Sequence, residues 1–324
     1  MYLCQGSAGC EVLAPAKLNL FLEILARRPD GFHEIETLMV PIDLYDTLTV
    51  RDDPNGTVRL TCRWARGLLK ANARADDDMA TPDAAMPDDR GRPPVAQWED
   101  LPEGSDNIAT RAVELLRVRA GVQSGAVLQL TKRIPSAAGL GGGSSDAAAA
   151  LAAVNRLWRL GWSRERLQEV AAEVGSDVPF FLGAGAAVCR GRGERIEPLP
   201  GVRALDFVVV APPEGLSTAE VYRGCRPAES LRPVARLTEA MRAGDFRKIE
   251  AAIHNQLEPA AERLSGWIGR AKRELTACGC MAVQMSGSGS SCFGICRDAR
   301  QARRAARWMR ARGWSRSAAV RSTR

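Results

Sequence analysis

The pattern of apolar and polar residues predicts extended strands in the first part of the chain. Residues 12–16 predict one strand. Residues 19–25 predict a strand with Leu20, Leu22 and Ile24 on one face and Asn19, Phe21 and Glu23 on the other. Residues 36–50 predict further strand, with breaks near Pro41 and again at residues 45–46. The sequence therefore predicts that the chain opens with a sheet.

Two stretches in the middle of the chain have the apolar spacing of amphipathic helices. Ser105 or Asp106 can cap the first helix, and Ser163 can cap the second. Gly175 ends the second helix as a C-cap. The apolar positions are Ile108, Ala112, Leu115 and Leu116 in the first helix and Leu167, Val170, Ala171 and Val174 in the second.

The second half of the chain mixes short strands and helices. Residues 207–211 form an apolar run typical of a buried strand, and residues 237–264 predict helices interrupted at residues 244–245. Two short strands, residues 282–285 and 292–296, flank a glycine-serine loop. Strand and helix do not alternate strictly, so the sequence predicts an α+β fold rather than a doubly wound sheet.

Residues 64–104 differ in composition from the rest of the chain. They contain the run Asp76-Asp77-Asp78, several prolines and many alanines, with no sustained period. A long segment of this kind inside a domain is usually a functional loop or a disordered insertion. We predict a surface insertion.

Length and composition narrow the class of protein. The chain has 324 residues, enough for two domains or one large one, with 45% hydrophobic and 26% charged residues. No run approaches the roughly 18 apolar residues of a membrane helix, and residues 1–10 do not resemble a signal peptide. We therefore expect no membrane partner. Nine cysteines without Cys-x-x-Cys spacing predict reduced thiols and a cytoplasmic protein.

The charge is uneven along the chain. The formal net charge is +7, and ten of the last 28 residues are arginine. This tail is either a nucleic-acid patch or the solvated face of a terminal helix. The buried side of such a helix would contain Ala302, Ala305, Ala306 and Met309. We favour the helix and expect no nucleic-acid partner. Because only His33 and His254 are present, multi-histidine metal sites are excluded.

A glycine-rich string between a strand and a helix is the strongest chemical signal. Residues 134–146 follow the predicted strand 127–131 and open into the alanine-rich run 147–154, a strong helix former. Glycines let a ligand approach the backbone closely, and the free N–H groups of a first helical turn suit phosphate. The spacing is neither that of a Walker A loop nor Gly-x-Gly-x-x-Gly.

Four single residues outside this loop are candidates for chemistry. Lys17 lies in an apolar strand and either extends to the surface or faces an anion. Asp177 precedes an apolar run, where it is either a helix N-cap or a general base. Residues 28–33 predict a turn that places Phe32 beside His33. The alternatives for these two are a core phenylalanine and a structural histidine.

The string Pro-x-x-x-Gly-Leu-Gly-Gly-Gly-Ser-Ser, residues 135–145, resembles the ATP loop of the GHMP kinases. Other stretches resemble the branch of that family that acts on 4-diphosphocytidyl-2-C-methyl-D-erythritol. They occur in the family's order and are residues 15–22, 28–33, 175–181, 217–222, 255–259 and 286–289. The departures are the insertion and the arginine-rich tail, and neither touches a motif.

The resemblance implies an ATP-dependent kinase that phosphorylates a hydroxyl of 4-diphosphocytidyl-2-C-methyl-D-erythritol, in the non-mevalonate route to isoprenoid precursors. The glycine-rich loop would hold the phosphates of ATP, with Mg²⁺ near Ser144 or Ser145. The implied ATP-binding residues are Pro135, Ser136, Ala137, Ala138, Gly139, Leu140, Gly141, Gly142, Gly143, Ser144 and Ser145, with Asn107 and Lys132 on the adenosine side.

The resemblance also implies catalytic and substrate-binding residues. Asp177 would accept the proton of the substrate hydroxyl, and Lys17 would keep Asp177 ionised and stabilise the transition state. Phe32 and Tyr222 would stack on the cytosine, and His33 would hydrogen-bond its edge. The full substrate-binding set is Asn19, Phe32, His33, Thr218 and Tyr222.

The implied fold is a two-domain α+β kinase of the GHMP type, with its active site in the cleft between the domains. Residues 1–188 would form the ATP-binding domain, with the insertion 64–104 on its surface. Residues 189–324 would form the substrate-binding domain, and the last helix would return toward the first domain. The Mg²⁺ ligands and the oligomeric state stay open.

Two alternatives remain. Another GHMP kinase would act on a small alcohol such as homoserine or mevalonate, but the Asp-Gly-Phe-His turn would then have no nucleobase to bind. A nucleic-acid-binding protein would use the arginine-rich tail, and its binding would weaken with salt.

Overall fold

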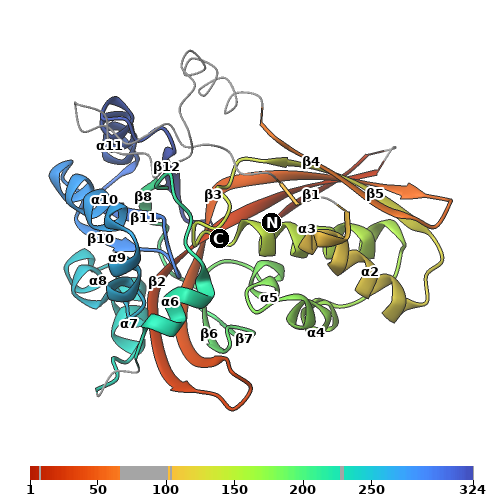
Figure 1. Cartoon of the computed structure of the whole chain (residues 1–324), viewed down its shortest axis with the longest axis horizontal. Coiled ribbons are helices and arrows are strands. Elements are labelled where there is room, and N and C mark those ends of the chain that lie inside the picture. The colour runs from red at the N-terminus through yellow and green to blue at the C-terminus, as the bar shows by residue number, and fades with distance from the viewer. Residues whose placement is uncertain (7–8, 66–100, 103, 227–229, 324) are drawn as a thin grey trace.

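The computed structural model describes residues 1–6, 9–65, 101–102, 104–226 and 230–323. Two sheets lie beside one another, and helices cover the outer side of each (Figure 1). Most neighbouring strands are antiparallel, and the two parallel pairs described are β2–β9 and β4–β5. The mixture of antiparallel sheets with helices on their outer sides confirms the predicted α+β class.

The larger sheet has the strand order β1-β2-β3-β5-β4, with β6 and β7 continuing from β3 and β9 beside β2. The strands of this sheet, within the described ranges, are β1 (Tyr2–Gly6), β2 (Gly9–Arg27), β3 (His33–Asp53), β4 (Val58–Trp64), β5 (Gly125–Lys132), β6 (Ala187–Gly191), β7 (Arg195–Pro198) and β9 (His254–Asn255).

The breaks predicted within residues 36–50 are wrong, because β3 runs unbroken past Pro41 and residues 45–46. The register shift opposite Pro15 and Ala16 shows a bulge, which adds residues without ending a strand. Pro41 is tolerated because β6 ends opposite Met39 and β5 begins only opposite Thr47. A missing N–H costs little in this interval, where neither strand pairs with β3.

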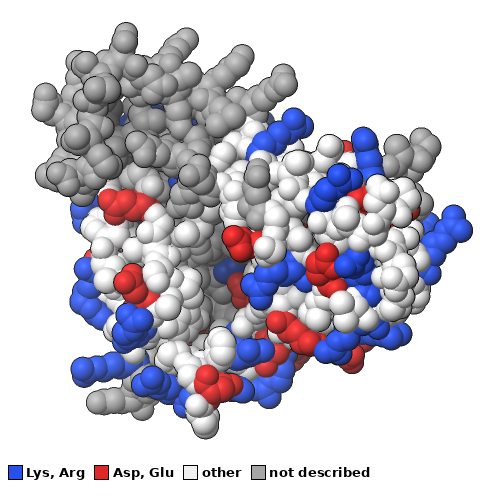
Figure 2. Space-filling view, turned by 45° about the vertical axis from the view of Figure 1, so that its right-hand side comes forward, with Lys and Arg blue, Asp and Glu red and all other residues white. Residues whose placement is uncertain are grey.

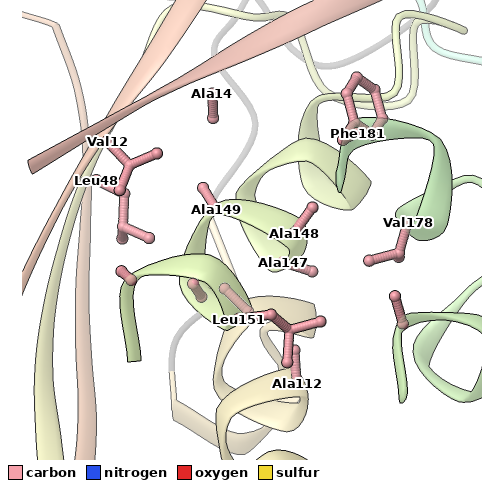
Figure 3. Close-up of a cluster of buried hydrophobic side chains, with 14 of the residues drawn as sticks. Val12, Ala14, Leu48, Ala112, Ala147, Ala148, Ala149, Leu151, Val178 and Phe181 are labelled. Atoms are coloured by element: carbon pink, nitrogen blue, oxygen red, sulfur yellow. The ribbon is translucent and has the colours of Figure 1, made fainter. Parts of the chain in front are cut away.

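The helices on the larger sheet surround the alanine-rich segment. They are η1 (Gly104–Asp106), α2 (Ile108–Ala120), α3 (Gly142–Leu157), α4 (Arg164–Val174) and α5 (Val178–Leu182). Residues 147–151 of α3 are fully buried between the sheet and α2, and the short side chains of the four alanines at residues 147–150 allow this close approach (Figure 3). Val12 and Leu48 meet the helix from the sheet side, and Ala112 meets it from α2.

The cap of α2 differs from the prediction. Asn107, rather than Ser105 or Asp106, is the N-cap, and its Oδ1 accepts a hydrogen bond of 2.9 Å from the Ala109 amide. The short 3₁₀ turn η1 occupies the two predicted cap positions. For α4 the predicted boundaries are confirmed, because Ser163 caps its start and Gly175 follows its end.

The smaller sheet has the strand order β10-β11-β8-β12. Its strands are β8 (Asp206–Val210), β10 (Ala282–Met285), β11 (Cys292–Cys296) and β12 (Ser317–Arg321). The helices of this half are α6 (Thr218–Gly224), α7 (Ala235–Ala243), α8 (Phe246–Ala252), α9 (Glu258–Leu264), α10 (Gly266–Ala277) and α11 (Ala299–Ala311). The predicted strands on either side of the glycine-serine loop and the predicted helix break at residues 244–245 are confirmed.

Successive side chains of β8 point to opposite faces of the smaller sheet, and one of these faces packs against the larger sheet. Phe207 and Val209 belong to a core shared with Leu18 and Leu20 of β2. The alternate residues of β8 pack instead in a cluster with α10 and α11. The smaller sheet therefore packs directly against β2. Loops that leave the two sheets meet at this junction.

The predicted domain boundary at residue 188 falls inside β6. This strand pairs with β3 on one side and with β7 on the other, so both β6 and β7 belong to the larger sheet. The last helix, α11, packs on β8, β11 and β12, with Ala302, Ala305, Ala306 and Met309 buried as predicted. Contact with the larger sheet comes from the end of the chain, where the Thr323 amide donates to the Pro41 carbonyl over 2.9 Å. Of the predicted insertion 64–104, residues 66–100 and 103 lie outside the described residues.

Candidate active site

The glycine-rich loop connects β5 to α3. Gly139 and Gly141 adopt φ angles of +73° and +70°, which favour glycine over residues with a β-carbon. A β-carbon on Gly141 would lie 2.9 Å from the Phe181 ring and 3.1 Å from Cγ of Lys17. The loop can therefore pass close to Lys17 only without a side chain at this position. The first amides of α3 have no carbonyl partner within the helix and can bind an anion.

A second loop, residues 286–291, packs against the first one. It connects β10 to β11, so it comes from the smaller sheet. The Ser286 hydroxyl donates to the Gly139 carbonyl over 3.0 Å, and the Ser291 amide donates to the Ala138 carbonyl over 3.1 Å. A β-carbon on Gly139 would lie only 2.1 Å from the Ser286 carbonyl oxygen. The two loops thus fix each other across the junction of the sheets.

Lys17 and Asp177 form an ion pair beside these loops. Lys17 Nζ lies 3.6 Å from Asp177 Oδ2, and the lysine side chain is almost completely buried. Lys17 also donates to Asn19 Oδ1, and Asn19 Nδ2 donates to Thr37 Oγ1 over 2.8 Å. Burial lowers the pKa of Lys17, and the Asp177 carboxylate opposes this shift. The lysine cation is consequently held at one point, with an anion facing it.

Asp177 occupies the N-cap position of α5, yet within the described residues its side chain makes no capping hydrogen bond. Its carboxylate is 35% exposed, whereas Lys17 is 4% exposed. The predicted alternative, a simple N-cap, therefore does not describe the side chain. The carboxylate is instead free to contact a ligand.

Lys132 is bound by two carboxylates. Its Nζ donates to Asp46 and, over 2.5 Å, to Asp146, and all three side chains are buried. Burial and the neighbouring Asp46 carboxylate raise the pKa of Asp146, although the Lys132 cation favours its ionised form. Among the described residues, Oδ1 of Asp146 has no hydrogen-bond partner. Lys132 lies beside the glycine-rich loop, where a β-carbon on Gly142 would lie 3.2 Å from its Nζ, but its charge is already offset.

Aromatic side chains line the other end of the site. The rings of His33 and Tyr222 lie 5.1 Å apart at an interplanar angle of 34°. Phe32, in the turn before β3, is 49% exposed, so it is not a core residue. Burial lowers the pKa of His33, which favours a neutral imidazole able both to donate and to accept a hydrogen bond. Thr218 and Ser288 bring their hydroxyl oxygens to 2.9 Å.

A single cleft of about 1120 Å³ contains nearly all of the predicted site residues. The exceptions are Leu140 and Ser145, which do not line it and are fully buried. Figure 2 shows the described surface hollowed between the two halves, with basic side chains near the hollow. Asn107 lines the cleft, but its amide already binds the Ala109 amide and the Pro102 carbonyl.

The cleft also contains residues that sequence reasoning did not assign to the site. They are Thr37, Asp146, Ser176, Arg192, Gly287 and Ser288, among others. The glycine-serine loop was a visible signal for the last two, and the turn sequence Gly-Arg-Gly-Glu was a signal for Arg192. Thr37 gave none, because a threonine inside a strand is ordinary.

Within the described part of the chain, we find no helix with the length and apolar character needed to cross a membrane. The same residues contain no cluster of three or more His, Cys, Asp or Glu side chains suited to a metal ion.

Two family models match the chain. They are GHMP kinases N terminal domain, over residues 107–185, and GHMP kinases C terminal, over residues 237–313. The crystal structure of homoserine kinase from Cytophaga hutchinsonii shares the fold, with a TM-score of 0.68 at 18% identity over 100% of this chain and 97% of that one. Fold and glycine-rich loop thus define the class, a kinase of the GHMP type.

More similar relatives narrow the class. The 4-diphosphocytidyl-2-C-methyl-D-erythritol kinase of Pelotomaculum thermopropionicum is 40% identical over 92% of this chain and 93% of that protein. A crystal structure of a 4-(cytidine 5'-diphospho)-2C-methyl-D-erythritol kinase has a TM-score of 0.72 and 35% identity, covering 97% of this chain and 99% of that one. The chain belongs to the 4-diphosphocytidyl-2-C-methyl-D-erythritol kinase family, which confirms the family predicted from the sequence.

Proposed function

We propose that the protein transfers the γ-phosphoryl group of ATP to a hydroxyl on the methylerythritol part of 4-diphosphocytidyl-2-C-methyl-D-erythritol, in the non-mevalonate route to isoprenoid precursors. One observation carries the proposal. A single cleft brings the glycine-rich loop, the Lys17–Asp177 pair and the aromatic pair His33–Tyr222 together. The glycine-rich loop offers a place for the phosphates of ATP, the Lys17–Asp177 pair a place for the reacting hydroxyl, and the aromatic pair a place for the nucleobase.

The glycine-rich loop binds the phosphates of ATP. Residues 139–144 line the cleft apart from Leu140, and α3 presents its first amides there. The dipole of this helix adds partial positive charge at the same end. Ser145 is fully buried behind the loop and does not line the cleft. We retain Asn107 and Lys132 as neighbours of the adenosine side.

The donor set of the cleft fits Mg²⁺. The ion prefers oxygen ligands and commonly takes one or two carboxylates together with substrate phosphates. Ser144 offers a partly exposed hydroxyl, and Asp146 offers the unpartnered Oδ1. These two residues would hold the ion. When bound, Mg²⁺ would offset negative charge on the phosphates of ATP.

Asp177 accepts the proton of the substrate hydroxyl as that oxygen attacks phosphorus. Its partly exposed carboxylate faces the cleft and lies 3.6 Å from Nζ of the buried Lys17. Asn19 orients Lys17 by accepting its hydrogen bond, and Thr37 in turn orients Asn19. Lys17 then stabilises the negative charge that develops during transfer.

The aromatic end of the cleft binds the cytosine. Phe32 and Tyr222 stack on the base, and the neutral His33 hydrogen-bonds its polar edge. Thr218 and Asn19 contact the part of the substrate that lies nearer to the phosphates of ATP. This pocket distinguishes the proposal from kinases of small alcohols, which have no base to stack.

The test is a turnover assay with purified protein, ATP and Mg²⁺, with three acceptors offered separately: the cytidine-linked substrate, homoserine and mevalonate. We expect kcat/KM for the cytidine-linked substrate to exceed the others by roughly 10³-fold or more, because a site built to hydrogen-bond one group rejects molecules that lack it. Phosphorus NMR of the product identifies the phosphorylated hydroxyl. Equal use of homoserine would return the protein to an unspecified GHMP kinase.

We also place the protein in the cytoplasm. Cys4, Cys10, Cys189, Cys225, Cys278, Cys280, Cys292 and Cys296 are free thiols in the structure, and free thiols are usual in reducing compartments. Fractionation of cells with an antibody against the protein checks this assignment.

A further inference from the structure

The cations that line the cleft are not equally available to a substrate. Lys17 is paired with Asp177, and Lys132 is held by two aspartates. Arg27 and Arg223 are exposed. Arg192 is partly buried, and the carboxylate nearest to it in the described structure, Glu194, lies 3.9 Å away, at the limit of an ion pair. Its guanidinium is thus oriented by the fold and makes no short ion pair in the described structure, although the Asp30 carboxylate also interacts with it electrostatically.

A tight turn between β6 and β7 holds Arg192 in place. Gly191 and Gly193, on either side of it, have φ angles of +77° and +118°. The Arg192 amide donates to Glu194 Oε2 over 2.7 Å, and a β-carbon on Gly191 would lie 2.6 Å from the same carboxylate group. Glu194 therefore folds back under the turn and fixes its backbone.

The turn lies between the reacting centre and the aromatic end of the cleft. A β-carbon on Gly193 would lie 3.5 Å from Asp177 Oδ1. The Arg192 guanidinium carbon lies 4.9 Å from the centre of the Phe32 ring. One residue and its neighbour thus span the distance from the proposed base to the proposed cytosine pocket. In a cytidine diphosphate-linked substrate, the diphosphate occupies the same interval between the acceptor hydroxyl and the cytosine.

We infer that Arg192 binds the diphosphate of the substrate, so that the protein recognises only cytidine compounds that carry phosphate groups. The inference rests on the proposed function. A guanidinium donates two parallel N–H bonds to phosphate oxygens, and its charge opposes that of the diphosphate. The face of the guanidinium meanwhile rests on Phe32, which favours a fixed orientation. The opposing reading is that Arg192 only covers the exposed ring of Phe32.

Binding measurements on cytidine, CMP and CDP separate the two readings. The ATP site is first filled with a non-hydrolysable ATP analogue and Mg²⁺, and each ligand is then titrated by calorimetry. Wild-type protein should bind CDP more tightly than cytidine. In Arg192→Ala the affinity for CDP should fall by about 10- to 100-fold, as for a lost hydrogen bond to a charged group. The affinity for cytidine should stay within about twofold of the wild-type value.

Arg195→Ala is the matched control. Arg195 lies on the same hairpin, pairs with Glu34 and does not line the cleft, so its loss should leave all three affinities unchanged. Arg192→Lys keeps the charge and loses the paired donors, so its affinity for CDP should fall between those of wild type and Arg192→Ala. Retained binding of cytidine shows that each variant is folded.

Three results would overturn the inference. They are an unchanged affinity for CDP in Arg192→Ala, an equal loss of affinity for cytidine and CDP, and a wild-type protein that binds the two equally. The second result would assign Arg192 to the support of Phe32. Failure of the proposed function is a separate outcome, since wild-type protein would then not phosphorylate the cytidine-linked substrate at all.

Discussion

The contact between the two glycine-containing loops can be tested by adding one methyl group. In Gly139→Ala the new β-carbon would lie 2.1 Å from the Ser286 carbonyl oxygen and 3.0 Å from that of Gly289. The φ angle of +73° adds strain for any residue other than glycine. Gly161→Ala is the matched control, because Gly161 has a similar φ of +65° and no heavy atom within 4 Å of its β-carbon position.

The structure sets the size of the expected difference. The left-handed backbone costs about 1–2 kcal/mol in both variants. Moving the Ser286 carbonyl aside adds about 1–3 kcal/mol in Gly139→Ala alone, the usual range for overpacking. At roughly 2.1 cal/mol/K of unfolding entropy per residue, a chain of 324 residues loses about 1.5 °C in Tm per kcal/mol. We therefore expect losses of about 3–7 °C for Gly139→Ala and about 1.5–3 °C for Gly161→Ala.

Calorimetry and steady-state kinetics check both parts of the prediction. A displacement of about 1 Å at the phosphate loop should lower kcat/KM for ATP by about 10²-fold in Gly139→Ala. Gly161→Ala should keep nearly normal kinetics, because its position lies away from the cleft lining. Equal Tm losses in the two variants, or normal kinetics in Gly139→Ala, would refute the reasoning that the loops are seated on each other.

Four further predictions follow from the site. Asp177→Asn should lower kcat by about 10²-fold or more with ATP binding retained, and normal turnover in the folded variant would exclude Asp177 as the base. Burial lowers the pKa of Lys17 below its usual 10.5, so kcat/KM should fall as rising pH removes the cation, before pH 10.5 is reached. Lys17→Arg, which does not titrate in that range, should lack this alkaline limb, and superimposable pH profiles would contradict the assignment. Phe32→Ala should raise KM for the cytidine-linked substrate by about 5- to 100-fold, because about 1–3 kcal/mol of stacking is lost. KM for ATP and Tm should stay unchanged. A lower Tm with both KM values raised would instead show that Phe32 only packs against its neighbours. Lys132→Met leaves Asp46 and Asp146 without their cation and should lower the free energy of unfolding by about 3–5 kcal/mol in urea titrations, whereas a loss below about 1 kcal/mol would show that the two carboxylates do not depend on it.

The sequence alone determined features that depend on neighbouring residues. Ser163 and Gly175 marked the ends of α4 because caps are made by local side-chain and backbone geometry. The small buried side of α11 followed from the helical period. The strand, glycine loop and helix around residue 141 were predicted because each has its own local signal. The family was predicted on the same basis, since its motifs are short and contiguous.

Tertiary structure decided everything that depends on residues distant in the sequence. β3 passes Pro41 without a break because β2 pairs with it on one side, while on the other side β6 has ended and β5 has not yet begun. Lys132 meets two aspartates that no spacing rule connects to it. Arg192 became a site residue only when the β6–β7 turn brought it over Phe32. Local propensity acts over a few residues, whereas the charge environment of a side chain depends on the packing of distant segments, which the linear pattern does not encode.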